Sequence, residues 1–229
     1  EVGEMTSPTE PSVTRSGWVR LLGAVVFVLL VAGAFAYFMN EDSSQPSSPA
    51  APPVVAFDSF DHSSSEQSLG RLDGEHEWTS VSGQWSIHGG VAHSAPSSSG
   101  ASFTTVEVGT NASVSAVTTG RGSCGLVAVF TDLSNFVSLQ REDKDGTWKI
   151  IVVSNGKAET MGSVAGILPN NNRVSLIVDP PVITAISGGD RSSVIVETLP
   201  TGTQAGLFTS GPSAQLCTFD DVAFITPSQ

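Results

Sequence analysis

The side chains that could perform acid–base chemistry are few and scattered in this chain of 229 residues. Glu75 and Glu77 flank His76, and a dense acidic run at residues 142–145 stands directly before Gly146. Hydrolysis of a glycosidic bond uses two carboxyl groups that face each other across a cleft, about 5–9 Å apart. The first pair stands in a loop-like stretch, and the acidic run marks a hairpin tip. We therefore expect solvated turns at both places and no enzyme activity.

The four histidines and the basic residues form no recognisable binding motif. His62, His76, His88 and His93 are separated by 14, 12 and 5 residues, whereas a zinc site needs them to converge with acidic or cysteine ligands. We expect them to be structural. The net charge is −12 and the ten Lys and Arg residues form no run, which argues against nucleic acid as a partner.

An uncharged apolar run of 19 residues, 21–39, is long enough to cross a bilayer. Arg15 and Arg20 precede the run, and excess positive charge marks the cytoplasmic side. A cleavable signal peptide is the alternative, but its apolar region is usually shorter, roughly 7–15 residues. The sequence predicts a single-pass plasma-membrane protein with a cytoplasmic tail (1–16), a transmembrane helix (17–39), a Pro/Ser linker (40–53) and an extracytoplasmic domain (54–229).

The chain has two cysteines, Cys124 and Cys217. Outside the cytoplasm a lone pair forms a disulfide more often than a metal site. No histidine stands near either cysteine in the sequence, which argues against a cysteine nucleophile. We expect a disulfide that ties a central strand to the last strand.

From residue 54 onward, apolar and polar residues alternate with a period of two. Turn pairs such as Asn155-Gly156 and Gly188-Gly189 separate the alternating runs. This pattern predicts an all-β domain, a two-sheet antiparallel β-sandwich. The expected strands include residues 102–108, 112–118, 125–131, 135–140, 147–153, 173–179, 182–187, 193–199 and 216–225.

Three stretches of the sequence contain short motifs that follow one another in a characteristic order. Residues 56–93 contain Asp-x-Phe, Leu-Gly and Gly-x-Trp-x-Ile-x-x-Gly; residues 124–156 contain aromatic-x-Asp, Asn-Phe and Asp-Gly-x-Trp; residues 202–225 contain Gly-Leu and Phe-Asp-Asp-Val. Together they resemble concanavalin A-like (laminin-G-like) jelly rolls over about residues 56–226. The resemblance implies a jelly-roll fold but no single function, because this fold hosts lectins, glycosidases and interaction modules.

The same pattern predicts which residues face the core. Gly125 and Gly206 are expected to permit close strand packing or a bulge. The expected core residues are Trp85, Ile87, Phe103, Val127, Val129, Trp148, Ile150, Leu176 and Phe219.

The resemblance also implies one metal-site hypothesis. The first and last strands of a jelly roll are commonly neighbours, so Asp58 and Asp61 are expected to approach Asp220 and Asp221. Several carboxylates together suit calcium; the alternative is that these aspartates cap turns and face water. No other cofactor is expected.

Sugar binding usually uses exposed aromatic rings. Trp78 is the first candidate and Phe136 the second, although both occupy positions that resemble the family's core pattern. Only 7% of the residues are aromatic, and the single Tyr lies in the apolar run. A rich stacking platform is therefore not expected.

These features lead to a prediction of a non-enzymatic accessory subunit of a larger bacterial membrane complex, such as a respiratory supercomplex. Its partners would be membrane protein subunits and the lipid bilayer, with the β domain bracing the outer face. The alternative is a membrane-tethered carbohydrate- or cell-wall-binding module. A diverged glycosidase is the third hypothesis.

Overall fold

The computed structural model describes residues 54–63, 68–72, 75–95, 100–141, 146–166, 172–211 and 217–226, and every element in these ranges is a strand. None of the described residues belongs to a helix long and apolar enough to span a bilayer. The predicted tail, membrane helix and linker, which end at residue 53, lie outside the described residues. So does the acidic run 142–145.

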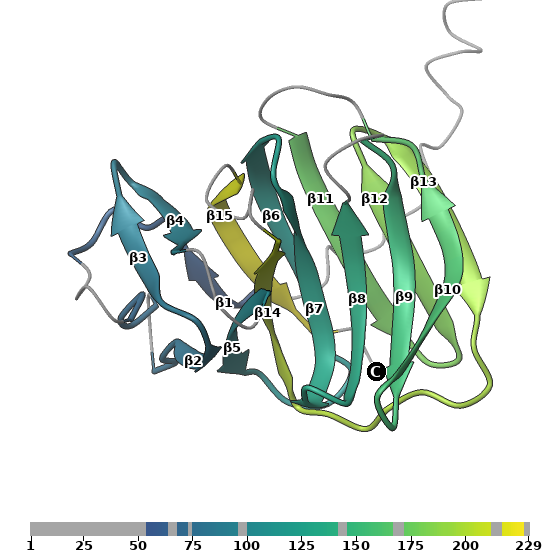
Figure 1. Ribbon diagram of the computed structural model, residues 1–229. Coiled ribbons are helices and arrows are strands. Elements are labelled where there is room, and N and C mark those ends of the chain that lie inside the picture. The colour runs from purple at the N-terminus through teal and green to yellow at the C-terminus, as the bar shows by residue number, and fades with distance from the viewer. Residues whose placement is uncertain are drawn as a thin grey trace, which may run out of the picture. The chain divides into compact units, whose positions relative to one another are not determined.

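The first sheet contains eight antiparallel strands (Figure 1). Their bounds are β1 Val54–Asp58, β3 Trp85–His88, β4 Val91–Ser94, β6 Ser113–Gly120, β11 Asn172–Asp179, β12 Val182–Ser187, β13 Asp190–Ile195 and β15 Cys217–Ile225. Seven of them follow the order β13-β12-β11-β6-β15-β4-β3, and β1 pairs with β15. Val54 is the register partner of Ile225 and Asp58 that of Val222, so the first and last strands are neighbours, as expected.

The second sheet contains seven antiparallel strands. Their bounds are β2 Thr79–Ser82, β5 Ala101–Glu107, β7 Ser123–Asp132, β8 Asn135–Arg141, β9 Trp148–Ser154, β10 Lys157–Val164 and β14 Gln204–Ser210. Their order is β10-β9-β8-β7-β14-β5-β2. In Figure 1, β7 to β10 lie in front of β11 to β13, so the two sheets form the predicted two-layer sandwich.

The core lies between the sheets and is built from alternate residues of their strands. Trp85, Trp148 and Phe219 are at most 2% exposed. The expected core residues Val129, Ile150 and Leu176 belong to the same cluster, and Ile87 packs against it. Burial of such side chains contributes roughly 1.5–3 kcal/mol each.

Two of the expected core residues point away from the main core. Phe103 and Val127 are buried, but they belong to a second apolar cluster on the outer face of the seven-stranded sheet. Their position follows from alternation, because Leu126 and Ala128, which flank Val127, both point into the main core. We call this group the outer phenylalanine cluster; its buried members are Phe103, Val127, Phe130, Phe136, Val153 and Phe208.

Gly125 and Gly206 permit close packing, as expected. A Cβ atom on Gly125 would collide with the carbonyl oxygen of Leu139 and with the ring of Phe208. One on Gly206 would collide with the carbonyl oxygen of Thr104. The absence of side chains at these positions lets neighbouring strands, and the Phe208 ring, approach.

Strand β13 ends earlier than the sequence pattern predicts. Residues 193–199 read as one strand, but pairing with β12 stops at Ile195. The backbone nitrogen of Val196 instead donates to the carbonyl of Pro181 at 2.8 Å. Pro200 has no N–H group for a sheet ladder, and residues 196–203 run as an irregular segment to β14.

Candidate functional site

One end of the sandwich carries two adjoining clefts. Strands β7, β9 and β13 finish at this end, which is at the bottom of Figure 1, and β8, β10 and β14 begin there. The first cleft has a volume of about 300 Å³ and the second about 500 Å³. Both are lined by Ser154 and Thr198. We call them together the strand-end groove.

Six of the eight residues that line the first cleft have neutral polar side chains. They come from the β7–β8 turn, the β9–β10 turn and the segment after β13: Thr131, Asn135, Ser154, Asn155, Thr198, Leu199, Pro200 and Thr201. The second cleft mixes charged and apolar residues: Val152, Ser154, Lys157, Ala158, Glu159, Met161, Val196 and Thr198.

Asn135 is held in one orientation by hydrogen bonds on both ends of its amide. Its Nδ2 donates to the two carboxylate oxygens of Asp132 at 3.1 and 3.3 Å. Its Oδ1 accepts a hydrogen bond from the backbone nitrogen of Asn155 at 3.0 Å. Asp132 also accepts from the backbone nitrogen of Ser134 at 2.7 Å. These bonds determine which end of the amide is the donor and which the acceptor.

The β9–β10 turn has the local conformation that its sequence predicts. Asn155 and Gly156 have φ values of 51° and 75°, the left-handed conformation that two-residue hairpin turns require and that Asn-Gly adopts readily. Gly156 also donates its backbone N–H to the carbonyl of Ser134 at 2.9 Å. The two neighbouring turns are thereby joined, and they form one wall of the groove.

The opposite wall, residues 198–201, is anchored to the strand ends. Thr131 Oγ1 donates to the carbonyl of Thr201 at 3.1 Å. The carbonyl of Thr203 accepts hydrogen bonds from the backbone nitrogens of Val108 and Gly109, each at 3.0 Å. A groove with an oriented amide and several hydroxyl groups can bind a polyhydroxylated ligand, and Leu199, Pro200 and Met161 supply apolar contact.

Trp78 does not offer a stacking face, so this part of the sugar-binding hypothesis is wrong. The side chain is 3% exposed. Its Nε1 donates to Asp58 Oδ2 at 2.7 Å, and its ring lies 5.6 Å from that of Phe224 and 6.0 Å from that of Phe60. Trp78 therefore belongs to the core, as the family pattern allowed.

Phe136 is not an exposed ligand-binding ring either. It is 6% exposed and lies within the outer phenylalanine cluster. Its ring centroid is 5.5 Å from that of Phe103 and 5.9 Å from that of Phe130. Phe103 in turn stacks on Phe208 at 5.5 Å. Rings packed on each other in this way occupy the middle of the sheet's outer face.

The four aspartates of the calcium hypothesis do not form one cluster. Asp58 is 1% exposed, and its carboxylate accepts hydrogen bonds from Phe60 N at 2.8 Å, His62 Nε2 at 3.0 Å and Trp78 Nε1. Asp221 lies 3.4 Å from Arg173. No group of three or more acidic, His or Cys side chains within the described ranges is placed to hold a metal ion.

Asp61 and Asp220 do lie near each other. The pKa of Asp220 is raised above 3.8 mainly by burial, and the charges of Asp221 and Asp61 raise it further. A hydrogen bond from the backbone nitrogen of Asp221 and the charge of Arg173 oppose this shift. The predicted approach of the first and last strands is thus correct, but the inward turn of Asp58 removes it from this group.

Two of the four histidines are brought together by the β3–β4 hairpin. The rings of His88 and His93 are 6.0 Å apart and nearly perpendicular. The pKa of His93 is lowered by burial and, to a smaller extent, by His88. The Nε2 atom of His93 is buried and makes no hydrogen bond, which favours the neutral ring.

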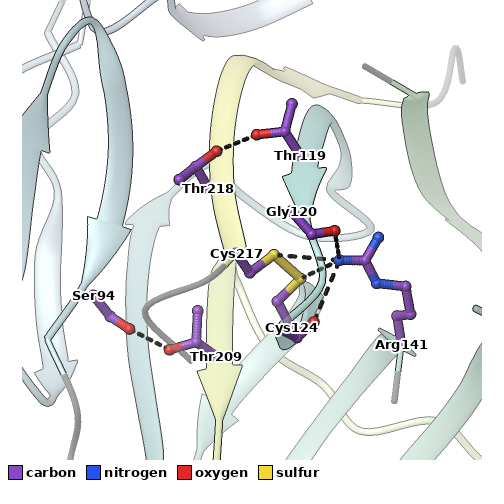
Figure 2. The surroundings of a disulfide bond; sticks show 9 residues. Ser94, Thr119, Gly120, Cys124, Arg141, Thr209, Cys217 and Thr218 are labelled. Carbon is purple, nitrogen blue, oxygen red and sulfur yellow. Dashed lines mark hydrogen bonds between the residues drawn. A yellow bond between two sulfur atoms is a disulfide. The ribbon is translucent and has the colours of Figure 1, made fainter. Parts of the chain in front are cut away.

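The end opposite the groove is closed by the predicted disulfide. Cys124 of β7 and Cys217 of β15 are bonded, and the bridge joins the two sheets across 93 residues (Figure 2). Arg141 Nη2 lies 3.7 and 3.9 Å from the two sulfur atoms and donates to the carbonyls of Gly120 and Gly122. The guanidinium also stacks over Trp148 at 5.3 Å. The described residues around the bridge are tightly packed, because the two cysteines, Arg141 and Trp148 are at most 5% exposed.

The groove was not anticipated from the sequence. Its residues come from three turns that are about 20 and 45 positions apart, and each turn reads as an ordinary loop. One indication was available: the aromatic-x-Asp and Asn-Phe pattern of the jelly-roll resemblance contains Asp132 and Asn135. Those two residues are bonded to each other in the structure.

No protein-family model matches the chain, and no curated protein matches it. Among solved structures, the carbohydrate-binding module CBM66 from Bacillus subtilis is similar, with 19% identity, a TM-score of 0.54, and coverage of 65% of this chain and 95% of that one. The GH43 protein BlXynB from Bacillus licheniformis has 13% identity and a TM-score of 0.54 over 75% of this chain. The match spans only 39% of BlXynB.

A prokaryotic β-1,3-1,4-glucanase (lichenase) from a mouse hindgut metagenome is also similar. It has 11% identity and a TM-score of 0.50, with coverage of 75% of this chain and 98% of that one. At such low identity these likenesses show the fold alone: a jelly-roll β-sandwich.

Proposed function

We propose that the β-sandwich is a carbohydrate-binding module, displayed outside the cytoplasm on a membrane tether, and that it binds glycans in the strand-end groove. The observation that carries the proposal is the oriented amide of Asn135, held between Asp132 and the backbone of Asn155 in a groove lined by threonine and serine hydroxyls. Such groups match the hydroxyls of a sugar ring.

The fold comparison supports this proposal. The module CBM66, which is named for carbohydrate binding, is matched over 95% of its length. The groove lies at the strand ends, whereas the outer face of the seven-stranded sheet is occupied by the outer phenylalanine cluster. We therefore place the ligand in the groove and not across that sheet.

The proposal is one of binding without hydrolysis. Two of the similar structures are described as a GH43 protein and a lichenase, but a likeness of 11–13% identity carries no activity to this chain. The other hypothesis, an accessory subunit of a respiratory or other membrane complex, gains no support from any similar structure and stays a prediction.

The test is a glycan-array screen with the full chain, purified in a detergent that has no sugar head group. Array ligands are then measured by isothermal titration calorimetry. We expect Asn135→Ala and Thr198→Ala to weaken binding at least about tenfold each, because each removes a polar group of the groove. Release of shortened oligosaccharides on incubation would show that the protein is an enzyme.

A matched control is Ser86→Ala, which removes a hydroxyl from β3, in the other sheet. It should leave the affinity unchanged. Array silence with correctly folded protein, or equal loss of binding in the groove variants and the control, would contradict the proposal.

A further inference from the structure

The strand-end groove is surrounded by negative charge. Glu159 lines the second cleft. Asp132 holds Asn135 in the first cleft, and its own side chain is exposed. Glu197 is exposed between Val196 and Thr198, which both line the groove. Three carboxylates are therefore part of the groove or adjacent to its lining.

Two more carboxylates lie at the same end of the sandwich. Asp179 ends β11 and Glu107 ends β5, and both are exposed. Each strand finishes at the groove end: Asp179 pairs with Val182 beside the Pro181 contact of Val196, and Glu107 pairs with Gln204 at the start of β14.

Among the described residues that line the groove, only one is positively charged. Lys157, the first residue of β10, is exposed and stands two residues from Glu159 on the same strand. Neighbours at this spacing point to the same side of a strand. Lys157 offsets one of the carboxylates, so that the groove keeps a net negative field.

From this charge distribution we infer that the groove selects uncharged or amino-bearing glycans and rejects acidic ones such as uronic acids. The inference rests on the proposed function and adds the ligand class to it. Neutral hydroxyls can use the oriented amide and hydroxyl groups of the first cleft. A sugar carboxylate in the same place is repelled by Glu159, Asp132 and Glu197, and specificity arises from this repulsion as much as from attraction.

The size of the effect follows from Coulomb's law. Each pair of like charges about 4–8 Å apart in water weakens binding by about two- to fivefold at low salt, and the net excess is about two charges. We therefore expect about tenfold weaker binding of a uronate than of the matching hexose at low ionic strength. Since salt screens exposed charges over about 10 Å at 0.1 M, the ratio should shrink below about threefold at 0.5 M salt.

The probes are pairs of oligosaccharides with the same linkage that differ only at C6: glucose against glucuronate, galactose against galacturonate, and mannose against mannuronate. The full chain is titrated with both members of each pair at low and high salt. Tighter binding of a neutral member, with a preference that falls as salt rises, supports the inference. Equal or tighter binding of the uronate overturns the inference and leaves the proposed function intact.

Failure to bind any probe, together with a silent glycan array, would instead overturn the proposed function and this inference with it.

Charge variants give a second, independent test of the inference. Glu159→Gln and Glu197→Gln should each reduce the preference for the neutral member by about two- to threefold, whereas Lys157→Gln should increase it. Asp190→Asn, at the opposite end of the sandwich, is the control and should not change the ratio. A Lys157→Gln variant with a reduced preference would contradict the electrostatic explanation.

Discussion

The side-chain oxygen of Asn135 accepts a hydrogen bond from the backbone nitrogen of Asn155 at 3.0 Å, so that the start of β8 and the turn after β9 hold each other in place. The bond links two turns that are 20 residues apart in the sequence. It makes the amide both a ligand-binding candidate and a local brace.

Replacing Asn135 with alanine should therefore have two separable effects. Loss of the bonds to Asp132 and Asn155 should lower the free energy of unfolding by about 1 kcal/mol, because the site is partly exposed. Urea denaturation measures this loss, and calorimetry measures the accompanying loss of glycan affinity. The control is again Ser86→Ala, on β3 in the other sheet; it should retain binding.

Trp78→Phe tests the structural role of the indole. The variant removes the hydrogen bond to Asp58, whose carboxylate is 1% exposed. A buried charged acceptor that loses a donor costs about 1.5–3 kcal/mol. We expect a destabilisation of that size in urea with unchanged glycan affinity. Val81→Ala, at an exposed neighbouring position, should change stability by less than about 0.5 kcal/mol.

The disulfide should contribute a large share of the stability. A bridge that closes a loop of 93 residues stabilises by about 4–5 kcal/mol in the chain-entropy model. The double variant Cys124→Ser, Cys217→Ser should show this loss in chemical denaturation. Wild-type protein unfolded in the presence of a reductant should show the same loss; a much smaller effect in both would mean that the reduced chain retains compact structure.

The His88–His93 pair should make the domain sensitive to acid. The pKa of His93 is lowered from 6.5, so the folded state binds a proton less readily than the unfolded chain. The sign follows from linkage: the contribution of His93 is complete above pH 6.5 and is lost as the pH falls through 6.5 toward the folded pKa. His93→Gln should flatten this part of the stability profile measured between pH 5 and 8.

A nuclear magnetic resonance titration gives the matched control. In His88→Gln the neighbouring imidazole is absent, so the pKa of His93 should move up part of the way toward 6.5. Burial, the larger cause, remains. A pKa of His93 that does not move would show that the two rings do not interact electrostatically.

The strand pattern, the sandwich and the disulfide could be predicted from the sequence. The alternation of apolar and polar residues is a local property, and two cysteines can form only one disulfide. The face of a strand could not always be predicted. Residues 125–130 of β7 are apolar on both faces, so alternation alone does not say whether Leu126 or Val127 points into the main core. Only the packing of neighbouring strands decides that Val127 joins the outer phenylalanine cluster.

The candidate site was harder to predict than the fold, because it depends on register. Trp78 and Asp58 are 20 residues apart, and their bond exists only because the chain brings the segment before β2 back beside β1. The groove unites three turns whose residue types are common in any loop. Sequence identifies such turns but not which of them meet.

The pairing of Val54 with Ile225 has a mechanical consequence. The chain enters and leaves the sandwich at adjacent positions of neighbouring antiparallel strands. Both positions lie at the end of the sandwich that carries the groove. A pulling force applied between residues 54 and 225 therefore acts across the β1–β15 ladder and breaks its hydrogen bonds one pair at a time. Asp58, the last residue of β1, is the last to detach. Its three internal hydrogen bonds would hold the end of the peeled strand to the core. A domain loaded in this way yields first at β1, while the disulfide at the far end keeps the two sheets together.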